Sequence, residues 1–109
     1  MYIVEFTDAA LDDLNSLGDE RTKQALIRIV KKELTSFPKS KGKTLGRSKS
    51  SGIIYYEKRF MFGAGYRVYY NVIEGIVVVD KVEYEGISRI NRASTKKTQK
   101  KVLRDLGLK

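Results

Sequence analysis

Residues 62–72 place the tightest constraint on what this chain can fold into. Two glycines, Gly63 and Gly65, mark a turn, and the residues from Tyr66 to Val72 then alternate with a period of two. This pattern predicts a hairpin followed by a strand with one buried face and one face toward water. Arg67 lies inside that strand, where Tyr and Val are favoured. It therefore needs a solvated face, a neighbouring carboxylate, or an anion such as a phosphate held against the sheet.

The first third of the chain predicts a strand over residues 2–6 and then two helices. Thr7 or Asp8 offers an N-cap for the first helix, and Gly18 ends it. Asp19 can cap the second helix, and Pro38 closes it. Its buried stripe is expected to consist of Leu26, Ile29, Val30, Leu34 and Phe37.

The remainder predicts a sheet and a short last helix. Residues 53–62, 66–73 and 76–84 are rich in β-branched and aromatic residues, and Glu74-Gly75 forms a tight turn between the last two segments. The run Ile76-Val77-Val78-Val79 predicts a central strand that is buried on both faces. Ser94 or Thr95 can cap the last helix, whereas residues 39–52 have the composition of a mobile surface loop.

These segments predict an α+β fold. It has an N-terminal strand, a helical hairpin, a curved and mostly antiparallel sheet of about four strands, and a C-terminal helix. A chain of 109 residues suits one domain. We expect a core over residues 2–84 and a basic extension over residues 85–109.

The charge predicts a polyanionic partner. The 22 basic and 13 acidic residues give a net charge of +9, and half of the basic residues lie in two segments. The first segment contains Lys39, Lys41, Lys43, Arg47 and Lys49, and the second contains Arg89, Arg92, Lys96, Lys97, Lys100 and Lys101. Both could follow a phosphate backbone, or they could simply be solvated.

The absence of two residue types limits the catalytic and metal-binding chemistry that this chain can perform. The chain has no cysteine and no histidine, which removes thiolate ligands and the commonest general base. The acids of the sheet region show no spacing typical of a magnesium site, so no metal or cofactor is expected. No segment resembles a signal peptide or a membrane span, and a cytoplasmic location fits this composition.

Arg67, Tyr69 and Asn71 share one face of the predicted strand. An odd-length hairpin loop adds Arg59 and Glu57 to this face, and an even-length loop adds Lys58 and Tyr56. An ion pair of Arg67 with Glu57 or Asp80 would explain the group without any function. Cations among tyrosines also suit RNA binding, and they suit RNA cleavage by the 2′-hydroxyl in which positive groups stabilise the phosphoryl oxygens.

The order of these elements resembles the RelE/ParE superfamily of bacterial toxin–antitoxin toxins. The best local match runs from Gly65 to Ile73 and is followed by Val77-Val78-Val79. The loop with Gly42-Lys43-Thr44-Leu45 is similar to the loop that precedes the sheet in those toxins, and the tail from Lys96 to Lys101 resembles phage-type, HigB-like members. Histidine chemistry of the HigB type is excluded, because the chain has no histidine.

The resemblance implies a toxin that cuts messenger RNA in the ribosomal A site, without a metal, leaving a 2′,3′-cyclic phosphate, and that a cognate antitoxin holds inactive. It assigns a catalytic role to Arg67 and maps the basic residue of the preceding strand to Lys58, with Arg59 beside it. The later arginine and tyrosine of the RelE branch align with Ile87 and Ala93. Residues that could replace them are Tyr84, Arg89 and Arg92.

Two other functions stay open at this point. ParE-like members share the fold, lack the ribonuclease residues and inhibit DNA gyrase, and a basic module could bind RNA or DNA without cutting it. The residues expected to bind RNA or the ribosome are Tyr69, Lys39, Lys41, Lys43, Arg47, Lys49, Lys96, Lys97 and Lys100. None of these functions requires a membrane.

Overall fold

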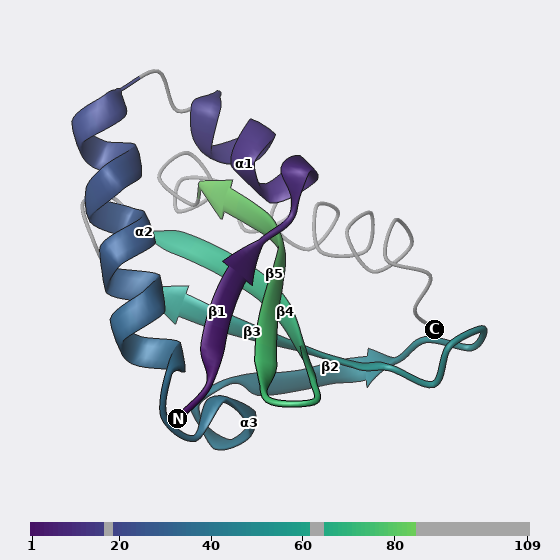
Figure 1. Cartoon of the computed structure of the whole chain (residues 1–109). Coiled ribbons are helices and arrows are strands. Elements are labelled where there is room, and N and C mark those ends of the chain that lie inside the picture. The colour runs from purple at the N-terminus through teal and green to yellow at the C-terminus, as the bar shows by residue number, and fades with distance from the viewer. Residues whose placement is uncertain (17–18, 62–64, 85–109) are drawn as a thin grey trace.

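Helices α1 and α2 pack on one face of a five-stranded sheet in the computed structural model (Figure 1). The structure describes residues 1–16, 19–61 and 65–84. The predicted helix over residues 94–106 therefore lies outside the described residues. In chain order the elements are β1 (Ile3–Phe6), α1 (Asp8–Asn15), α2 (Glu20–Leu34), α3 (Pro38–Lys41), β2 (Lys43–Arg47), β3 (Ile54–Phe60), β4 (Tyr66–Ile73) and β5 (Ile76–Tyr84).

The two long helices begin at the predicted caps. The Thr7 hydroxyl accepts a hydrogen bond from the Ala10 amide at 3.1 Å, and the Asp19 carboxylate accepts one from the Arg21 amide at 3.1 Å. Each bond satisfies an amide that has no partner within its helix. The end of α2 differs from the prediction, because the helix stops at Leu34 and leaves Phe37 outside it.

The sheet has the strand order β1-β5-β4-β3-β2. Strand β1 runs parallel to β5, and the other neighbours are antiparallel. Glu74 and Gly75 have φ values of 47° and 82°, as a tight two-residue hairpin requires, and β4 and β5 have the predicted bounds.

Residues 39–52 were predicted as a mobile loop, and this prediction is wrong over most of the segment. Residues Pro38–Lys41 form the short helix α3, and Lys43–Arg47 form the edge strand β2 beside β3. A β-bulge interrupts β2 between Thr44 and Gly46. Edge strands often carry cations and bulges of this kind, which discourage pairing with another chain.

A buried tyrosine anchors this segment to the sheet. The Tyr70 hydroxyl donates a hydrogen bond of 2.6 Å to the Pro38 carbonyl, and the Tyr70 ring stacks on Tyr56. Gly42 lies so close that a β-carbon there would sit 2.0 Å from the Tyr70 hydroxyl oxygen. Only glycine fits at this position, so the start of β2 has a fixed place.

The main core lies between the helices and the sheet. It joins side chains of α1 and α2 to the helix-facing side chains of four strands. Its buried members are Val4, Ala10, Leu14, Leu26, Val30, Leu34, Tyr56, Phe60, Tyr66, Val68, Tyr70, Val77, Val79 and Val82. None of the described helices is long and apolar enough to cross a membrane.

The expectation that one face of β4 meets water is wrong. Arg67, Tyr69 and Asn71 are 2%, 1% and 3% exposed, although they alternate with the core residues and so point to the opposite face. We call this opposite face of the sheet the far face. Both faces of β4 are therefore buried from Tyr66 to Asn71. The prediction of burial on both faces is wrong for the run Ile76–Val79 of β5, because Val78 is only partly buried.

Candidate functional site

The far face carries a band of charged and hydroxyl side chains across three strands. The ladder places Arg59 of β3 opposite Arg67 of β4, which lies opposite Glu83 of β5. One step along, Glu57 lies opposite Tyr69. We call these residues the Arg67 row: Glu57, Arg59, Arg67, Tyr69 and Glu83. Arg59 is thus the cation that the hairpin register brings to the face of Arg67.

Carboxylates balance the charge of Arg67. Its Nε lies 3.9 Å from Oε2 of Glu57, and the two side chains are 3% and 15% exposed. Arg59 and Arg67 are like charges at directly opposite ladder positions, which disfavours the pairing on its own. Glu57 and Glu83, on the two strands that flank β4, offset this repulsion.

Tyr69 is a proton donor in this row. Its hydroxyl donates a hydrogen bond of 3.4 Å to Oε2 of Glu83. Burial raises the pKa of the Tyr69 phenol, the Glu83 carboxylate raises it further, and Arg67 offsets part of the shift. The phenol therefore stays protonated at neutral pH and cannot act as a base.

Asp80 and Asn71 form a second polar pair on β5 and β4. The register shifts between Tyr69 and Tyr70, so that Asp80 is the extra residue of a bulge. The Asn71 amide nitrogen donates to Oδ2 of Asp80 at 2.6 Å. Burial raises the pKa of the Asp80 carboxyl, and this hydrogen bond counteracts part of the rise.

The structure separates two predicted residues from Arg67. Lys58 lies opposite Val68 and therefore on the helix-facing side, where its ammonium is 5.4 Å from the centre of the Phe60 ring. The centres of the Tyr84 and Tyr66 rings are 5.3 Å apart, and both rings lie on the helix-facing side of the sheet. Of the described candidates, Arg59, Tyr69 and Lys43 share the face of Arg67. Arg89, Arg92, Lys96, Lys97 and Lys100 lie outside the described residues.

The first basic segment adjoins the row at the edge of the sheet. Lys39 and Lys41 lie on α3, Lys43 and Arg47 on β2, and Lys49 in the turn that follows, and all five are exposed. We call these five residues the cationic arm. Lys43 is the cross-strand partner of Glu57, so this member of the arm lies beside the Arg67 row. No residue of the arm forms an ion pair within the described part of the chain.

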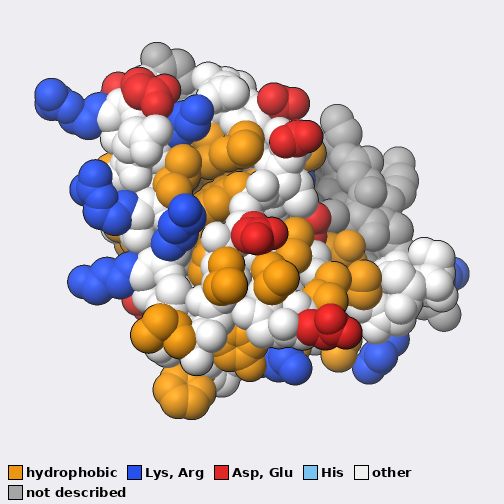
Figure 2. Space-filling model, viewed as in Figure 1, with side chains coloured by type: hydrophobic (Ala, Val, Ile, Leu, Met, Phe, Trp, Pro, Cys, Tyr) orange, Lys and Arg blue, Asp and Glu red, His pale blue; other side chains and the backbone are white. Residues whose placement is uncertain are grey.

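A second set of cations lies away from this edge. Figure 2 shows Lys and Arg side chains gathered along α2, and Arg21, Arg28 and Lys31 of that helix are exposed. Helix α2 packs against the helix-facing side of the sheet. Its cations therefore do not adjoin the far face, and they provide a natural comparison for the cationic arm.

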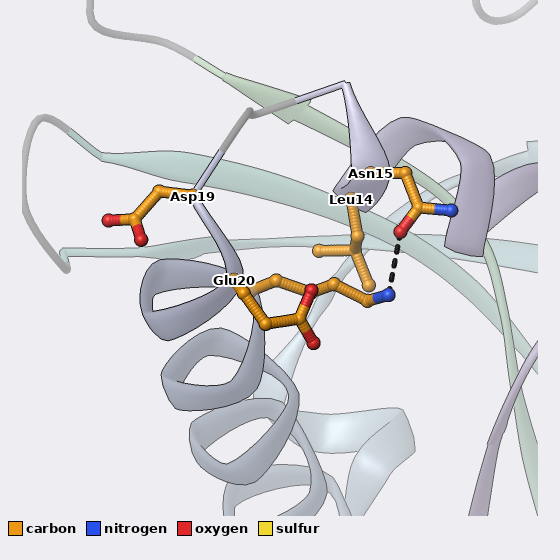
Figure 3. Close-up of a pocket in the computed structure, with 5 residues that line it drawn as sticks. Leu14, Asn15, Asp19 and Glu20 are labelled. Atoms are coloured by element: carbon orange, nitrogen blue, oxygen red, sulfur yellow. Dashed lines mark hydrogen bonds between the residues drawn. The ribbon is translucent and has the colours of Figure 1, made fainter.

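A pocket of about 200 Å³ lies where α1 meets α2 (Figure 3). Its polar lining groups already have partners. The Lys23 ammonium donates to Oδ1 of Asn15 at 2.6 Å, Gln24 donates to Glu20 at 2.9 Å, and Asp19 caps α2. The Lys23–Asn15 bond joins the two helices, and the other bonds lie within α2 and its cap.

Sequence reasoning treated Glu57 only as a charge partner. Its position as the carboxylate of the row, between Lys43 on β2 and Tyr69 on β4, depends on the strand register. The number of residues in the loop between β3 and β4 sets this register and so the position of Glu57. The sequence alone did not determine that number. No group of three or more acidic side chains that could hold a metal ion occurs among the described residues.

No protein-family model matches the chain, and no curated protein matches it. The fold is similar to that of a chain in the crystal structure of the toxin–antitoxin complex RelBE2 from Mycobacterium tuberculosis. The two chains are 28% identical, with a TM-score of 0.59, over 76% of this chain and 96% of that chain. This similarity does not bear on the HigB-like features of the tail. The chain therefore has a RelE-like α+β fold.

Proposed function

We propose that this chain is the toxin of a toxin–antitoxin pair and that it stops translation by cutting messenger RNA on the ribosome. The similarity to a chain of the RelBE2 toxin–antitoxin complex is the observation that carries this proposal. The net charge of +9 and the exposed cationic arm fit a target made of RNA. Its partners are then a cognate antitoxin, the ribosome and the message, all in the cytoplasm.

The Arg67 row supplies groups for metal-independent cleavage. The 2′-oxygen attacks the adjacent phosphorus and the bond to the 5′-oxygen breaks, which leaves a 2′,3′-cyclic phosphate and a free 5′-hydroxyl. Glu57 accepts the 2′-proton, because Tyr69 stays protonated and the chain has no histidine. Arg67 and Arg59 stabilise the phosphoryl oxygens, and we assign Lys43, the neighbour of Glu57, to protonate the leaving oxygen.

The remaining candidates keep secondary roles in this proposal. Lys39, Lys41, Arg47 and Lys49 hold phosphates of the same strand. Arg89, Arg92, Lys96, Lys97 and Lys100 would add to the positive charge that attracts RNA. Lys58 and Tyr84 would support the sheet from its helix-facing side rather than touch the phosphate.

One observation favours a second candidate function. Arg67 is 2% exposed and lies beside a carboxylate, which is the arrangement of a structural ion pair. A chain in which Arg67 has only this structural role would act without cutting RNA, as a ParE-like inhibitor of DNA gyrase or as a binding module.

Mapping RNA ends after brief induction in bacteria separates these functions. We expect new 5′-hydroxyl ends at a constant codon phase on translated messages, and none on messages whose start codon has been removed. Arg67→Lys keeps a charge beside Glu57 but loses the guanidinium fork, so cleavage should fall about 100-fold or more while cooperative melting persists. Intact messages together with altered plasmid supercoiling would establish gyrase inhibition instead.

A further inference from the structure

Phe37 stands out on the surface of this chain. The sequence pattern placed it in the buried stripe of α2, but the structure exposes 76% of it. Its backbone has φ 52° and ψ 48°, a left-handed conformation that bulky residues rarely adopt. A large apolar ring held in water on an unfavourable backbone suggests an interaction site.

The backbone that follows Phe37 is held in place by several hydrogen bonds. Its carbonyl oxygen accepts hydrogen bonds from the Ser40 amide at 3.1 Å, the Lys41 amide at 3.2 Å and the Ser40 hydroxyl at 3.1 Å. The next residue, Pro38, is anchored to the sheet by Tyr70. The ring is therefore presented from a fixed point, and its binding costs little ordering of the main chain.

The charges around Phe37 indicate what the ring binds. Lys39 and Lys41 follow within four residues, and the chain has no acidic residue between Glu33 and Glu57. Aromatic residues at the centres of protein interfaces are surrounded by few lysines, because lysine is depleted there. An aromatic ring among exposed lysines instead fits single-stranded nucleic acid, in which bases stack on the ring and phosphates meet the cations.

We propose that Phe37 is a stacking platform for one unpaired base of the message, and that Lys39 and Lys41 hold the phosphates on either side of that base. The inference rests on the proposed function in one respect, namely that the ligand is RNA. The chain leads from Phe37 through α3 to Lys43, which is the cross-strand neighbour of Glu57. Phe37 then fixes the position of the strand a few nucleotides from the bond that is cut.

The test measures binding of the purified full chain to a short unstructured RNA that carries 2-aminopurine, a base whose fluorescence falls when it stacks. Phe37→Ala should weaken binding about 5- to 150-fold and reduce the quenching, as expected for the loss of one base–aromatic stack. Phe37→Trp should keep both signals. Ile3→Ala is the matched control, since Ile3 is 63% exposed on β1 at the opposite edge of the sheet, and it should bind like the wild type.

A glycine variant distinguishes the effect of the Phe37 ring on binding from the effect of the Phe37 backbone conformation on stability. Phe37→Gly relieves the left-handed conformation, so it should melt at a higher temperature than Phe37→Ala while binding RNA equally weakly. Wild-type affinity in Phe37→Ala, with message cleavage intact in the wild type, would overturn this inference alone. A loss of affinity for ribosomes or for the antitoxin, with single-stranded RNA bound as before, would also overturn it. A wild type that neither binds RNA nor cuts messages would overturn the proposed function as well.

Discussion

Asp80 shows how a single residue can weaken this fold. Its carboxylate is partly buried at the bulge of β5, with the Asn71 amide as its hydrogen-bond donor. Oδ1 of Asn71 is buried and has no hydrogen-bond partner in the described part of the chain. A neutral group at position 80 could donate to that oxygen, whereas a carboxylate cannot.

Asp80→Asn should therefore stabilise the protein at neutral pH. Burial raises the pKa of Asp80 in the folded chain above its unfolded value of about 3.9, so the folded state binds more protons between these two values. Stability then falls as the pH rises through that window, and the variant avoids this loss. Melting temperatures measured from pH 3 to pH 8 should diverge above about pH 4. Asp12→Asn, which changes an exposed carboxylate, is the control, and a variant less stable than the wild type at pH 7 would contradict the argument.

Phe37 shows why a residue can mislead sequence analysis. It follows Val30 and Leu34 at helical spacing, so the periodicity places it on the buried face of α2. Proline disfavours helical backbone in the residue before it, and α2 ends at Leu34. The left-handed conformation that Phe37 adopts instead costs about 1–2 kcal/mol, which no sequence pattern indicates.

At the scale of elements, the hydrogen bond from Tyr70 of β4 to Pro38 of α3 fixes the position of the start of the cationic arm. Tyr70→Phe leaves the buried Pro38 carbonyl without its donor and should lower the free energy of unfolding by about 1–3 kcal/mol. Gly42→Ala should cost at least as much, because its β-carbon would overlap the Tyr70 hydroxyl.

The double variant tests whether these two effects share a cause. Removing the hydroxyl relieves the closest contact, so the combined cost should be smaller than the sum of the single costs. Urea unfolding of the four proteins measures this difference. Strictly additive costs would show that Gly42 and Tyr70 act independently.

The elements that sequence analysis predicted best are those with local signals. Glu74-Gly75 fixes the turn between β4 and β5, and Thr7 and Asp19 fix two helix starts. Strand β2 was missed because its sequence, Lys-Thr-Leu-Gly-Arg, has low β-propensity and contains a bulge. It forms because β3 provides a partner and Tyr70 holds its start.

The candidate site depended on contacts between elements, and sequence analysis found it only in part. Arg67 and Tyr69 follow from alternation within one strand. The choice of Arg59 over Lys58, and the position of Glu57, follow from the β3–β4 register. Burial of the far face could not be predicted either, because alternation indicates two faces without indicating what each one meets.

At the scale of the molecule, the exposed cations of the cationic arm and those of α2 should differ in RNA binding. Replacing Lys39, Lys41 and Lys43 by alanine removes three charges from the cationic arm. The slope of log affinity against log salt for single-stranded RNA should then become shallower by about 2, at about 0.7 for each phosphate contact. Titrations between 50 and 200 mM salt measure this slope.

The control for this prediction removes the same charge elsewhere. Alanine at Arg21, Arg28 and Lys31 of α2 also lowers the net charge by three, so the total charge is matched. The α2 variant should keep a slope close to that of the wild type. Equal changes in both variants would mean that total charge, and not the cationic arm, determines binding.

The parallel pairing of β1 with β5 has a consequence for the timing of folding. Thr7, directly after β1, donates to the carbonyl of Asp80, 73 residues further along the chain. The sheet is complete only when its first strand meets its last, and closing such a long loop slows folding. In the described part of the chain, β5 is the only strand that pairs with β1. A nascent chain whose β5 is still inside the ribosome therefore cannot add β1 to the sheet. We therefore expect each newly made molecule to complete its sheet only after synthesis has passed Tyr84.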